Sequence, residues 1–452
     1  MPVPSNKLLI YTLVVGIPLF TLLGLMEVPL AGVVGIGVML ALVVAMDMPG
    51  AAASLRRLKV EVPKVIRTTK GRKFELPLVV VNGGMLAKRI KVGLPLPEEI
   101  DGEKSVLDWK LRNDDERNGT KWELLAVERG SFKMERLYFE GISGLGFWLG
   151  RRAIEVLVEV KVYPDLSHER SVLAPLFFRR GTIGVHQVRQ IGKGREFEQL
   201  RAYAPGDGYE DVYWKGTAKR RFPVTKMFQL ERTQEVYVAV DCSRRSRRRL
   251  EGLIGHEEAG MVAKTQLERY IQAALVLALA AQQQSDRFGL LVFSDKVQRV
   301  IPAGSGRAHY DVIRDVLYTL QAQAVSPDFD ELFVQIGNRM RQRALLLILT
   351  DLGEPWLAES FVEGVSLVSR RHVVLTHMLG QKEVRPMFGD GDRVEDDDEL
   401  YGRLAGQLMW NDLQETMRLL KQRGVHLTSS TQESLVADVV SEYLKVKKRQ
   451  LI

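Results

Sequence analysis

The sequence has almost no cysteine and lacks the common catalytic and nucleotide-binding motifs. It has one cysteine, Cys242, among 452 residues, which excludes an internal disulfide framework and a Cys-rich zinc site. Its seven histidines form no HExxH pair, and no GxSxG, Walker or kinase motif is present. These absences disfavour common hydrolase, zinc-protease and nucleotide-binding classes. We expect Cys242 to be a small core residue, because no histidine near it in sequence would activate its thiol.

The chain also lacks a strong excess of charge. Its net charge is +8, which suits an anionic membrane surface or a nucleic acid and by itself favours neither. With 452 residues, of which 46% are hydrophobic, the chain is long enough for two or three domains with substantial cores.

Long apolar runs, in contrast, are present at the start. Leu8 to Met46 is almost wholly apolar but is broken by Glu27 and Pro29, so it reads as two spans, Leu8 to Met26 and Val28 to Met46. Each run has about the 20 residues that a helix needs to cross a hydrocarbon core. A cleaved signal peptide is the alternative, but two spans in tandem are too long for one. The sequence therefore predicts a transmembrane helical hairpin in residues 1–50.

The charges that flank this hairpin indicate its orientation. Lys7 precedes the spans, Arg56, Arg57 and Lys59 follow them, and no Lys or Arg lies between them. Basic residues are enriched on the cytoplasmic side of membrane proteins. We therefore expect a protein of the cytoplasmic (inner) membrane whose soluble domains lie in the cytoplasm.

Residues 51–165 change to short alternating apolar and polar runs. Turn signals such as Asn82-Gly83-Gly84 and Asn118-Gly119 separate the runs. The expected strands are 58–62, 74–81, 89–96, 121–127 and 154–164. Regularly spaced short strands predict a β-sandwich, which we expect to be immunoglobulin-like. No catalytic grouping is visible in it, so its expected role is that of a spacer or docking module.

Residues 166–231 form a linking segment rich in Gly, Arg and aromatic residues. Gly192 and Gly194 flank Lys193 and could cradle a phosphate, but no GxGxxG or Walker pattern surrounds them. Basic residues beside Trp214 could bind single-stranded nucleic acid. The simpler interpretation is that the Arg, Asp and Trp side chains of this segment hold one another, and we expect no nucleic-acid partner.

Residues 232–452 alternate strands with helices. Apart from the first strand, which starts at Glu235, the expected elements are helix 261–284, strand 290–293, strand 298–302, helix 310–320, helix 328–340, strand 344–350, helix 356–370, strand 372–379, helix 400–423, strand 425–429 and a helix from 432. This alternation predicts an α/β doubly wound fold with a mainly parallel sheet. Two of its strands end at aspartates, Asp241 and Asp351, and such strand ends are where these folds place their sites.

A long motif in the linking segment resembles a known family. The stretch GREFEQLRAYAPGDGYEDVYWKGTAKRRFPVTKMFQLER, followed by a strand that ends in Asp-x-Ser, is similar to the signature of the domain-of-unknown-function 58 (DUF58) family of membrane-anchored proteins. Its signature positions are Gly194, Glu196, Phe197, Arg201, Tyr203, Gly206, Asp207, Asp211, Trp214 and Lys215. Glu128-Arg129-Gly130, Ser143 to Phe147 and Val162-Tyr163-Pro164 resemble the family's upstream positions.

This resemblance implies a C-terminal von Willebrand factor A-like domain. It also implies a protein partner, because family members are often found alongside MoxR-type AAA+ ATPases. A domains hold a divalent cation with an Asp-x-Ser-x-Ser turn, a Thr from a separate loop and a later Asp. Asp241, Ser243 and Asp351 match three of these positions, and Mg²⁺ is the cation that such oxygen ligands would suit. Arg245 stands at the second serine position, and Gly304-Ser305-Gly306 stands where the Thr would be.

Two interpretations of this site remain open. Arginine cannot ligate a cation, so an ion pair between Arg245 and an aspartate is the alternative to a metal. The turn also carries a basic cluster that could capture an acidic partner or lipid phosphates, or could be a solvated loop, and its members are Arg244, Arg245, Arg247, Arg248 and Arg249. The acidic run 390–399 lacks the spacing of a calcium loop, so we expect a solvated insertion.

The expected function is that of a membrane-anchored, non-enzymatic scaffold without a cofactor. Its A-like domain would bind a protein such as a MoxR-type ATPase and help to assemble or remodel an envelope complex. A divalent-cation-dependent ligand-binding or adhesion domain is the alternative.

Overall fold

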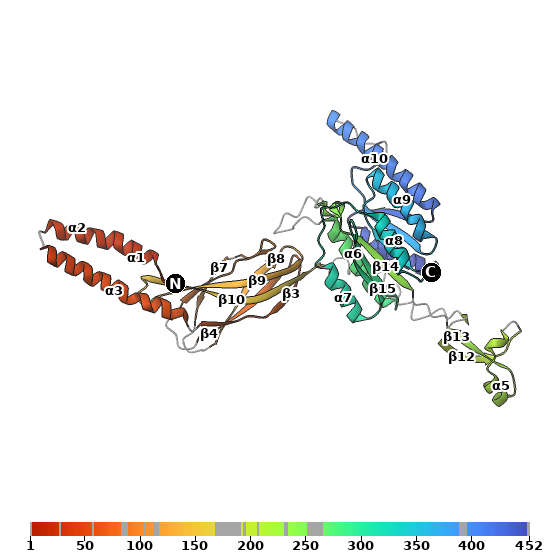
Figure 1. Ribbon diagram of the computed structural model, residues 1–452, viewed down its shortest axis with the longest axis horizontal. Helices are drawn as coiled ribbons and strands as arrows, with labels where there is room; N and C mark the ends of the chain where they lie inside the picture. The colour runs from red at the N-terminus through yellow and green to blue at the C-terminus, as the bar shows by residue number, and fades with distance from the viewer. Residues whose placement is uncertain are drawn as a thin grey trace. The chain divides into compact units, whose positions relative to one another are not determined.

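The structure is a computed structural model that describes most of the chain. The described residues are 2–26, 29–56, 58–82, 89–103, 105–111, 117–167, 191–192, 196–205, 208–229, 234–250, 265–387 and 396–449. The chain divides between Asp165 and Leu166 into two compact units (Figure 1).

The first unit begins with a helical hairpin. Its elements are α1 (Asn6–Tyr11), a π-helical turn (Thr12–Gly16), α2 (Ile17–Leu25) and α3 (Leu30–Arg56). Pro18 lacks an N–H, and the π-helical turn that precedes it accommodates the interrupted hydrogen-bond ladder. The hairpin has two helical stretches, Asn6–Leu23 and Ala31–Ala51, that are long and apolar enough to cross a membrane. No residue of the first stretch and 6% of those in the second are buried in the protein, which is compatible with contact to lipid.

A β-sandwich follows the hairpin. One sheet has the order β1-β10-β9-β5-β7 with β3 paired to β10, and the other has the order β2-β4-β8-β6. The strands are β1 (Pro2–Pro4), β2 (Leu58–Glu61), β3 (Val65–Thr69), β4 (Lys73–Asn82), β5 (Arg89–Gly93), β6 (Ile100–Asp101), β7 (Val106–Lys110), β8 (Arg117–Ala126), β9 (Gly130–Ile142) and β10 (Trp148–Tyr163). Inward-facing side chains of both sheets, such as Leu78 and Trp122 from one and Ile90 and Val160 from the other, share one hydrophobic core. The five expected strands are present as β2, β4, β5, β8 and β10, whereas β1, β3, β6, β7 and β9 were not predicted.

The second unit begins with a small antiparallel sheet of the order β11-β13-β12. Its elements are β11 (Ile191–Gly192), β12 (Glu196–Ala202), a 3-10 turn (Tyr209–Asp211), α5 (Trp214–Arg220) and β13 (Val224–Gln229). The Val224 amide donates to the Thr217 hydroxyl at 3.0 Å, which ties α5 to β13. Most of the DUF58-like signature therefore folds into a small module.

The rest of the second unit is the expected doubly wound domain. Its sheet has the order β16-β15-β14-β17-β18-β19, and β16 alone runs antiparallel to its neighbour among the described strands. The elements are β14 (Glu235–Asp241), a 3-10 turn (Arg244–Arg247), α6 (Gln266–Gln283), β15 (Arg287–Phe293), β16 (Val297–Gly304), α7 (Arg307–Leu317), α8 (Phe329–Arg339), β17 (Leu345–Leu349), α9 (Pro355–Ser369), β18 (Val373–Leu379), α10 (Asp397–Gln422), β19 (His426–Ser430) and α11 (Leu435–Arg449). Each expected strand and helix of this domain is present, with bounds shifted by a few residues.

Helices cover both faces of this sheet (Figure 1). Alternate residues of β14 point to opposite faces, so Val238 packs with α6, α7 and α11, whereas Ala239 packs with α8, α9 and α10. The order of the strands reverses between β14 and β17, because the chain leaves these two strands toward opposite ends of the sheet. This point is where doubly wound folds form a crevice at the carboxyl ends of their strands.

Candidate functional site

The candidate site lies at the carboxyl ends of β14 and β17. Val240 pairs with Leu349 in the parallel ladder, so the residues that follow, Asp241 and Thr350, meet at the same edge of the sheet. The Thr350 hydroxyl donates to Asp241 Oδ2 at 2.7 Å. Thr350 was not assigned to the site from the sequence, although its place directly before Asp351 is a signal for it.

Asp241 is wholly buried and fully hydrogen-bonded. Its Oδ1 accepts from the Ser243 amide at 2.8 Å, and its carbonyl accepts from the Ser246 hydroxyl at 2.6 Å. The pKa of Asp241 is raised to about 6: burial is the largest cause and the nearby charge of Asp351 adds to it, whereas the hydrogen bonds from Thr350 and Ser243 lower it. The site therefore contains a carboxyl group that can take up a proton at mildly acidic pH.

Asp351 is paired with an arginine of the chain itself. Its Oδ1 accepts from the Gly353 amide at 2.9 Å, and its Oδ2 lies 3.2 Å from Arg245 Nη2. Arg245 Nη1 also donates to Glu354 Oε1 at 2.7 Å. Asp351 is 1% exposed and the Arg245 side chain is 21% exposed, so this ion pair is largely shielded from water. The ion pair that the sequence left as an alternative to a metal is the arrangement in the structure.

These residues fit a divalent cation poorly. All four carboxylate oxygens of Asp241 and Asp351 accept hydrogen bonds from the chain, and the guanidinium of Arg245 lies against Asp351. One observation favours a cation: Ser243 Oγ is buried with no hydrogen-bond partner in the described part of the chain. A cation beside Asp351 would have to displace the guanidinium, whose positive charge opposes it. No group of three or more His, Cys, Asp or Glu side chains that could hold a metal ion occurs among the described residues.

Cys242 faces the core between these polar residues. It is fully buried, and its thiol lies 3.1 Å from the Phe293 carbonyl oxygen, to which it donates. Burial raises the pKa of the Cys242 thiol to about 12. A thiol with such a pKa is not a nucleophile at neutral pH.

The basic turn, Arg244 to Arg249, follows directly. Its backbone is fixed at three points: the Arg244 amide donates to the Val325 carbonyl at 2.8 Å, the Gln266 amide donates to the Arg248 carbonyl at 2.9 Å, and Ser246 bonds Asp241. Arg244, Arg247 and Arg249 are exposed, whereas Arg245 and Arg248 are half-buried. The structure thus divides the predicted cluster: Arg245 is bound within the site, and three arginines face solvent from an ordered backbone.

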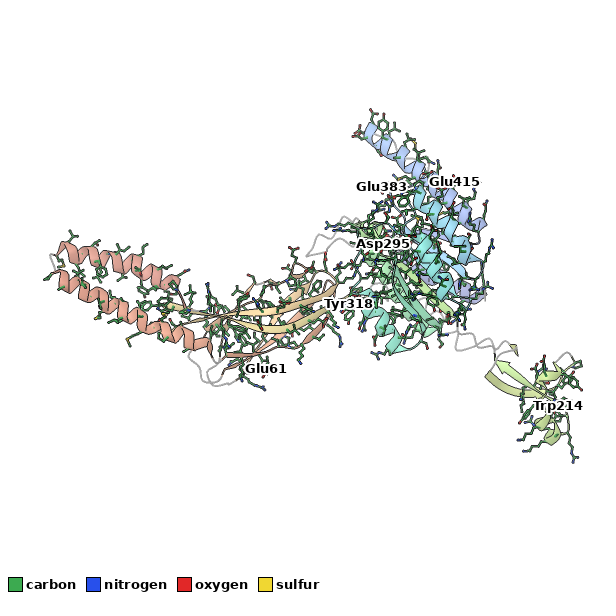
Figure 2. All side chains as sticks on the ribbon, in the orientation of Figure 1. Glu61, Trp214, Asp295, Tyr318, Glu383 and Glu415 are labelled. Atoms are coloured by element: carbon green, nitrogen blue, oxygen red, sulfur yellow. The ribbon has the colours of Figure 1, made fainter. Side chains whose placement is uncertain are left out.

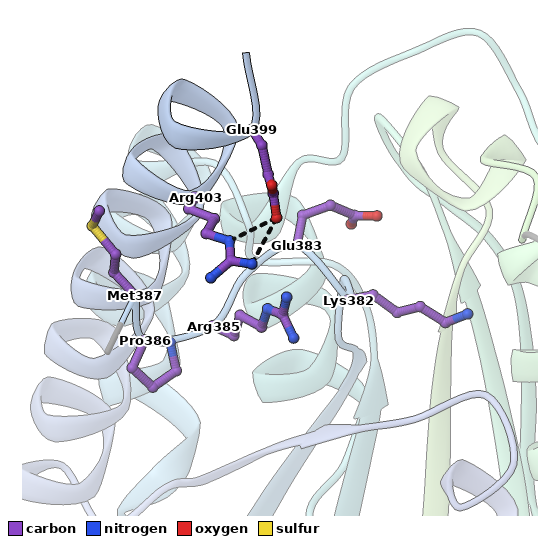
Figure 3. Close-up of a pocket in the computed structure, with 8 residues that line it drawn as sticks. Lys382, Glu383, Arg385, Pro386, Met387, Glu399 and Arg403 are labelled. Carbon is purple, nitrogen blue, oxygen red and sulfur yellow. Dashed lines mark hydrogen bonds and ion pairs between the residues drawn. The ribbon is translucent and has the colours of Figure 1, made fainter. Parts of the chain in front are cut away.

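A cavity lies beside the same edge of the sheet, after β18. It has a volume of about 460 Å³ and is lined by Lys382, Glu383, Arg385, Pro386, Met387, Glu399, Gly402 and Arg403 (Figure 3). Arg403 pairs with Glu399 at 2.6 Å at its mouth. Its lining carries charges of both signs and no arrangement of nucleophile and base. Part of the acidic run 390–399 lies outside the described residues, and Asp397 to Glu399 form the first turn of α10.

The signature residues lie in the small module. Glu196, Phe197 and Arg201 belong to β12, and Trp214 and Lys215 begin α5, whereas Gly194, Gly206 and Asp207 lie outside the described residues. Asp211 ends the 3-10 turn, and the Tyr203 amide donates to the Pro223 carbonyl at 2.9 Å. Trp214 (Figure 2) is 58% exposed, and the centroid of its ring lies 5.7 Å from that of Tyr209.

Residues 199–397 match the family described as "Protein of unknown function DUF58". This part of the chain is similar to the DUF58 family. The DUF58 match covers most of the module and the candidate site as far as the start of α10. The resemblance found in the signature motif is therefore confirmed.

Several solved structures resemble this chain at low identity. The conserved hypothetical protein BatB from Bacteroides thetaiotaomicron is 16% identical, with a TM-score of 0.29 over 48% of this chain and 99% of that one. An aerotolerance-related membrane protein from Bacteroides fragilis NCTC 9343 is 16% identical, with a TM-score of 0.26 over 47% and 99%. The VWA domain of SpRpn10 is 11% identical, with a TM-score of 0.29 over 46% and 95%. No curated protein matches the sequence. At these identities and TM-scores the likenesses do not establish a function.

Proposed function

We propose that this protein is a membrane-anchored adaptor whose doubly wound domain binds a protein partner at the carboxyl edge of its sheet. The observation that carries this proposal is the basic turn. Three exposed arginines, Arg244, Arg247 and Arg249, project from a backbone that hydrogen bonds fix beside the strand crossover point. An ordered backbone lowers the entropy lost on binding, because only the side chains remain to be ordered.

The same geometry favours binding over catalysis. Asp241 and Asp351 are engaged by hydrogen bonds and by Arg245, and the Cys242 thiol is buried with a raised pKa. A catalytic site needs a nucleophile within reach of a base, and these residues supply no such pair. We therefore propose that the protein is not an enzyme.

Guanidinium groups recognise carboxylates and phosphates through paired hydrogen bonds. A partner that offers an acidic segment would complement the basic turn. The family resemblance suggests a MoxR-type AAA+ ATPase as this partner, with the pair assembling or remodelling an envelope complex. The helical hairpin would hold the complex at the inner membrane, and the basic residues on both sides of the hairpin favour a cytoplasmic position for the soluble domains.

We also propose that the sandwich is immunoglobulin-like and acts as a spacer. Seven of its strands, β2, β4, β5, β6, β8, β9 and β10, can be lettered A to G in chain order, and they lie in the orders A-B-E-D and C-F-G, with β1, β3 and β7 as additional strands of the second sheet. This partial agreement with the order in an immunoglobulin constant-type domain supports the proposal. Such a domain commonly separates functional parts of membrane-anchored proteins.

Charge reversal tests the adaptor function. Arg244, Arg247 and Arg249 would be replaced together by Glu in the full-length chain, and proteins that co-purify from native membranes would be identified. The control reverses Arg339, Arg341 and Arg343, which are exposed and lie before β17, at the opposite edge of the sheet. We expect the ATPase to be lost from the first variant and retained by the second. Retention by both would contradict the proposed face.

A divalent-cation-dependent ligand-binding domain is the second candidate. The unpartnered hydroxyl of Ser243 favours it, whereas the ion pair of Arg245 with Asp351 opposes it. Calorimetric titration of Mg²⁺ into the full-length protein separates the two candidates. Heat of binding that disappears in Asp241→Ala would support a metal site, and its absence would remove this candidate.

A further inference from the structure

The loop between β9 and β10 lies where the helical hairpin joins the sandwich (Figure 1). This loop, which we call the junction loop, comprises Ser143 to Trp148. It contains the Ser-Gly-Leu-Gly-Phe residues that resemble upstream positions of the family. The proposed adaptor function assigns no role to these residues.

The junction loop is fixed to α3 by one buried carboxylate. Asp47 is 7% exposed, and it accepts hydrogen bonds from the Ser143 hydroxyl at 2.5 Å, the Leu145 amide at 3.0 Å and the Phe147 amide at 3.1 Å. The Trp148 indole N–H donates to the Val44 carbonyl of α3 at 2.7 Å.

The start of the chain holds the loop from the other side. The Ser5 amide donates to the Phe147 carbonyl at 2.8 Å, and the Ser5 hydroxyl donates to the Gly146 carbonyl at 2.6 Å. Strand β1, which leads into α1, pairs with the start of β10. Gly146 has φ +83°, a conformation that a residue with a Cβ adopts only under strain. The loop is therefore held against the residues that lead into α1 and against Val44 and Asp47 of α3, near one end of each apolar stretch.

The outer side of the loop is apolar. Leu145 is 60% exposed, and the ring of Phe147 packs edge-to-face against Tyr11 of α1, with centroids 6.0 Å apart. This surface continues that of the helices, where Ile10 is 61% exposed and Met46 is 80% exposed. A Lys beside aromatic and aliphatic side chains is typical of a membrane–water interface, and Lys7 lies at this level.

We propose that the junction loop inserts Leu145 and Phe147 into the headgroup layer of the bilayer, as a third membrane contact beside the two helices. Water would otherwise surround a leucine that the chain holds rigidly outward. Lipid is the one occupant that already covers the adjoining helix surfaces in a spanning hairpin. The proposal requires a membrane-spanning hairpin and does not depend on the binding of a partner by the basic turn.

The test places a fluorescent probe at single cysteines of the full-length protein in vesicles of phosphatidylcholine and phosphatidylglycerol. The variants are Leu145→Cys in the loop, Lys73→Cys as the control and Val38→Cys within α3. Because Cys242 is buried, the unsubstituted chain measures background labelling. The control position, Lys73, lies at the start of β4, close to the turn that joins β3 and β4. In this turn the Lys70 amide donates to the carbonyl of Tyr163, the last residue of β10, whereas the junction loop lies at the first residue of this 16-residue strand. Lys73 is therefore roughly 50 Å from Trp148 at 3.3 Å per residue.

We expect lipids that are spin-labelled near the headgroup to quench the Leu145 probe several-fold more than the Lys73 probe, and iodide in the water to do the reverse. Equal behaviour of these two probes, with the Val38 probe quenched by deeply labelled lipid, would overturn the membrane contact of the loop. If the Val38 probe is not quenched, the hairpin does not span the membrane, and the proposal fails because it requires a spanning hairpin. Neither outcome would bear on partner binding, which the charge-reversal experiment tests separately.

Discussion

Replacing Arg245 by Ser examines the chemistry of the candidate site most closely. The substitution removes the guanidinium that pairs with Asp351 and Glu354 at 3.2 and 2.7 Å. It also places a hydroxyl at the position where metal-binding A domains carry their second serine. If the guanidinium takes the place of a cation, Arg245→Ser should lose stability in the absence of metal and acquire affinity for Mg²⁺.

The magnitude follows from the burial of the pair. Removing one partner of a buried ion pair costs about 3–5 kcal/mol. Water reaches part of Arg245, whose side chain is 21% exposed, so we expect a loss of about 2–3 kcal/mol. A Mg²⁺ concentration of about 100 times Kd would return about 2.7 kcal/mol, which is nearly the whole loss.

Amide hydrogen exchange in β14 and β17 measures this loss in a chain of several domains, where a single unfolding midpoint is poorly defined. A loss of about 2–3 kcal/mol corresponds to exchange that is about 30- to 150-fold faster. Arg244→Ser is the matched control. Its side chain is 53% exposed and lies 3.9 Å from Glu354, so its loss should stay below about 0.5 kcal/mol. Unchanged protection in Arg245→Ser, or an equal effect of Mg²⁺ on the unsubstituted chain, would refute this reasoning.

Three further substitutions test the fold and its electrostatics. Because burial raises the pKa of Asp241 to about 6, the folded state holds this proton more tightly than the unfolded state; its contribution to stability is therefore greatest below about pH 4 and is lost as the pH rises to 6. Between pH 7 and pH 4 the parent should accordingly gain about 2.5 kcal/mol over Asp241→Asn in the free energy of opening that amide hydrogen exchange in β14 measures, and parallel profiles would contradict this. Lys447→Met should cost about 3 kcal/mol, because it leaves the buried carboxylate of Asp286 without the ammonium that lies 2.6 Å away; a second substitution, Asp286→Asn, should recover part of this loss. Phe361→Ala should cost about 3–5 kcal/mol, because the ring is fully buried and packs against Phe329 with centroids 5.0 Å apart; a loss below 1 kcal/mol would mean that this core is loosely packed.

The doubly wound domain could be predicted from the sequence because its strands and helices carry unambiguous local signals. The run from Leu345 to Leu349 is wholly apolar and wholly buried, as a central parallel strand requires. Helix α8 begins at Asp328, whose side chain accepts from the Glu331 amide, and this capping residue marks the helix start in the sequence. Such signals depend on neighbouring residues alone.

The sandwich was predicted less completely because β9 changes its phase. The buried residues Met134 and Leu137 are three positions apart, whereas Leu137 and Phe139 keep the two-residue spacing. The register with β10 shifts between Glu155 and Val158, opposite this interruption. A bulge of this kind moves the inward face by one residue, and strict alternation along the sequence is lost.

Parts of the site could not be predicted because they depend on contacts between strands. The aspartates were identified from their positions at strand ends. The hydrogen bond of Thr350 to Asp241, however, follows from the pairing of β14 with β17, which no local pattern specifies. The family resemblance places Arg245 at the position of the second serine of A domains, and only the fold shows that its guanidinium reaches both Asp351 and Glu354.

Site-specific photo-crosslinking tests the adaptor function most directly. A photoreactive residue would replace Arg247 in the basic turn or Arg341 at the opposite edge, in full-length protein within native membranes. We predict that position 247 captures a MoxR-type ATPase, identified by mass spectrometry, and that position 341 does not. Capture of no ATPase from position 247, or equal capture from both positions, would contradict the account.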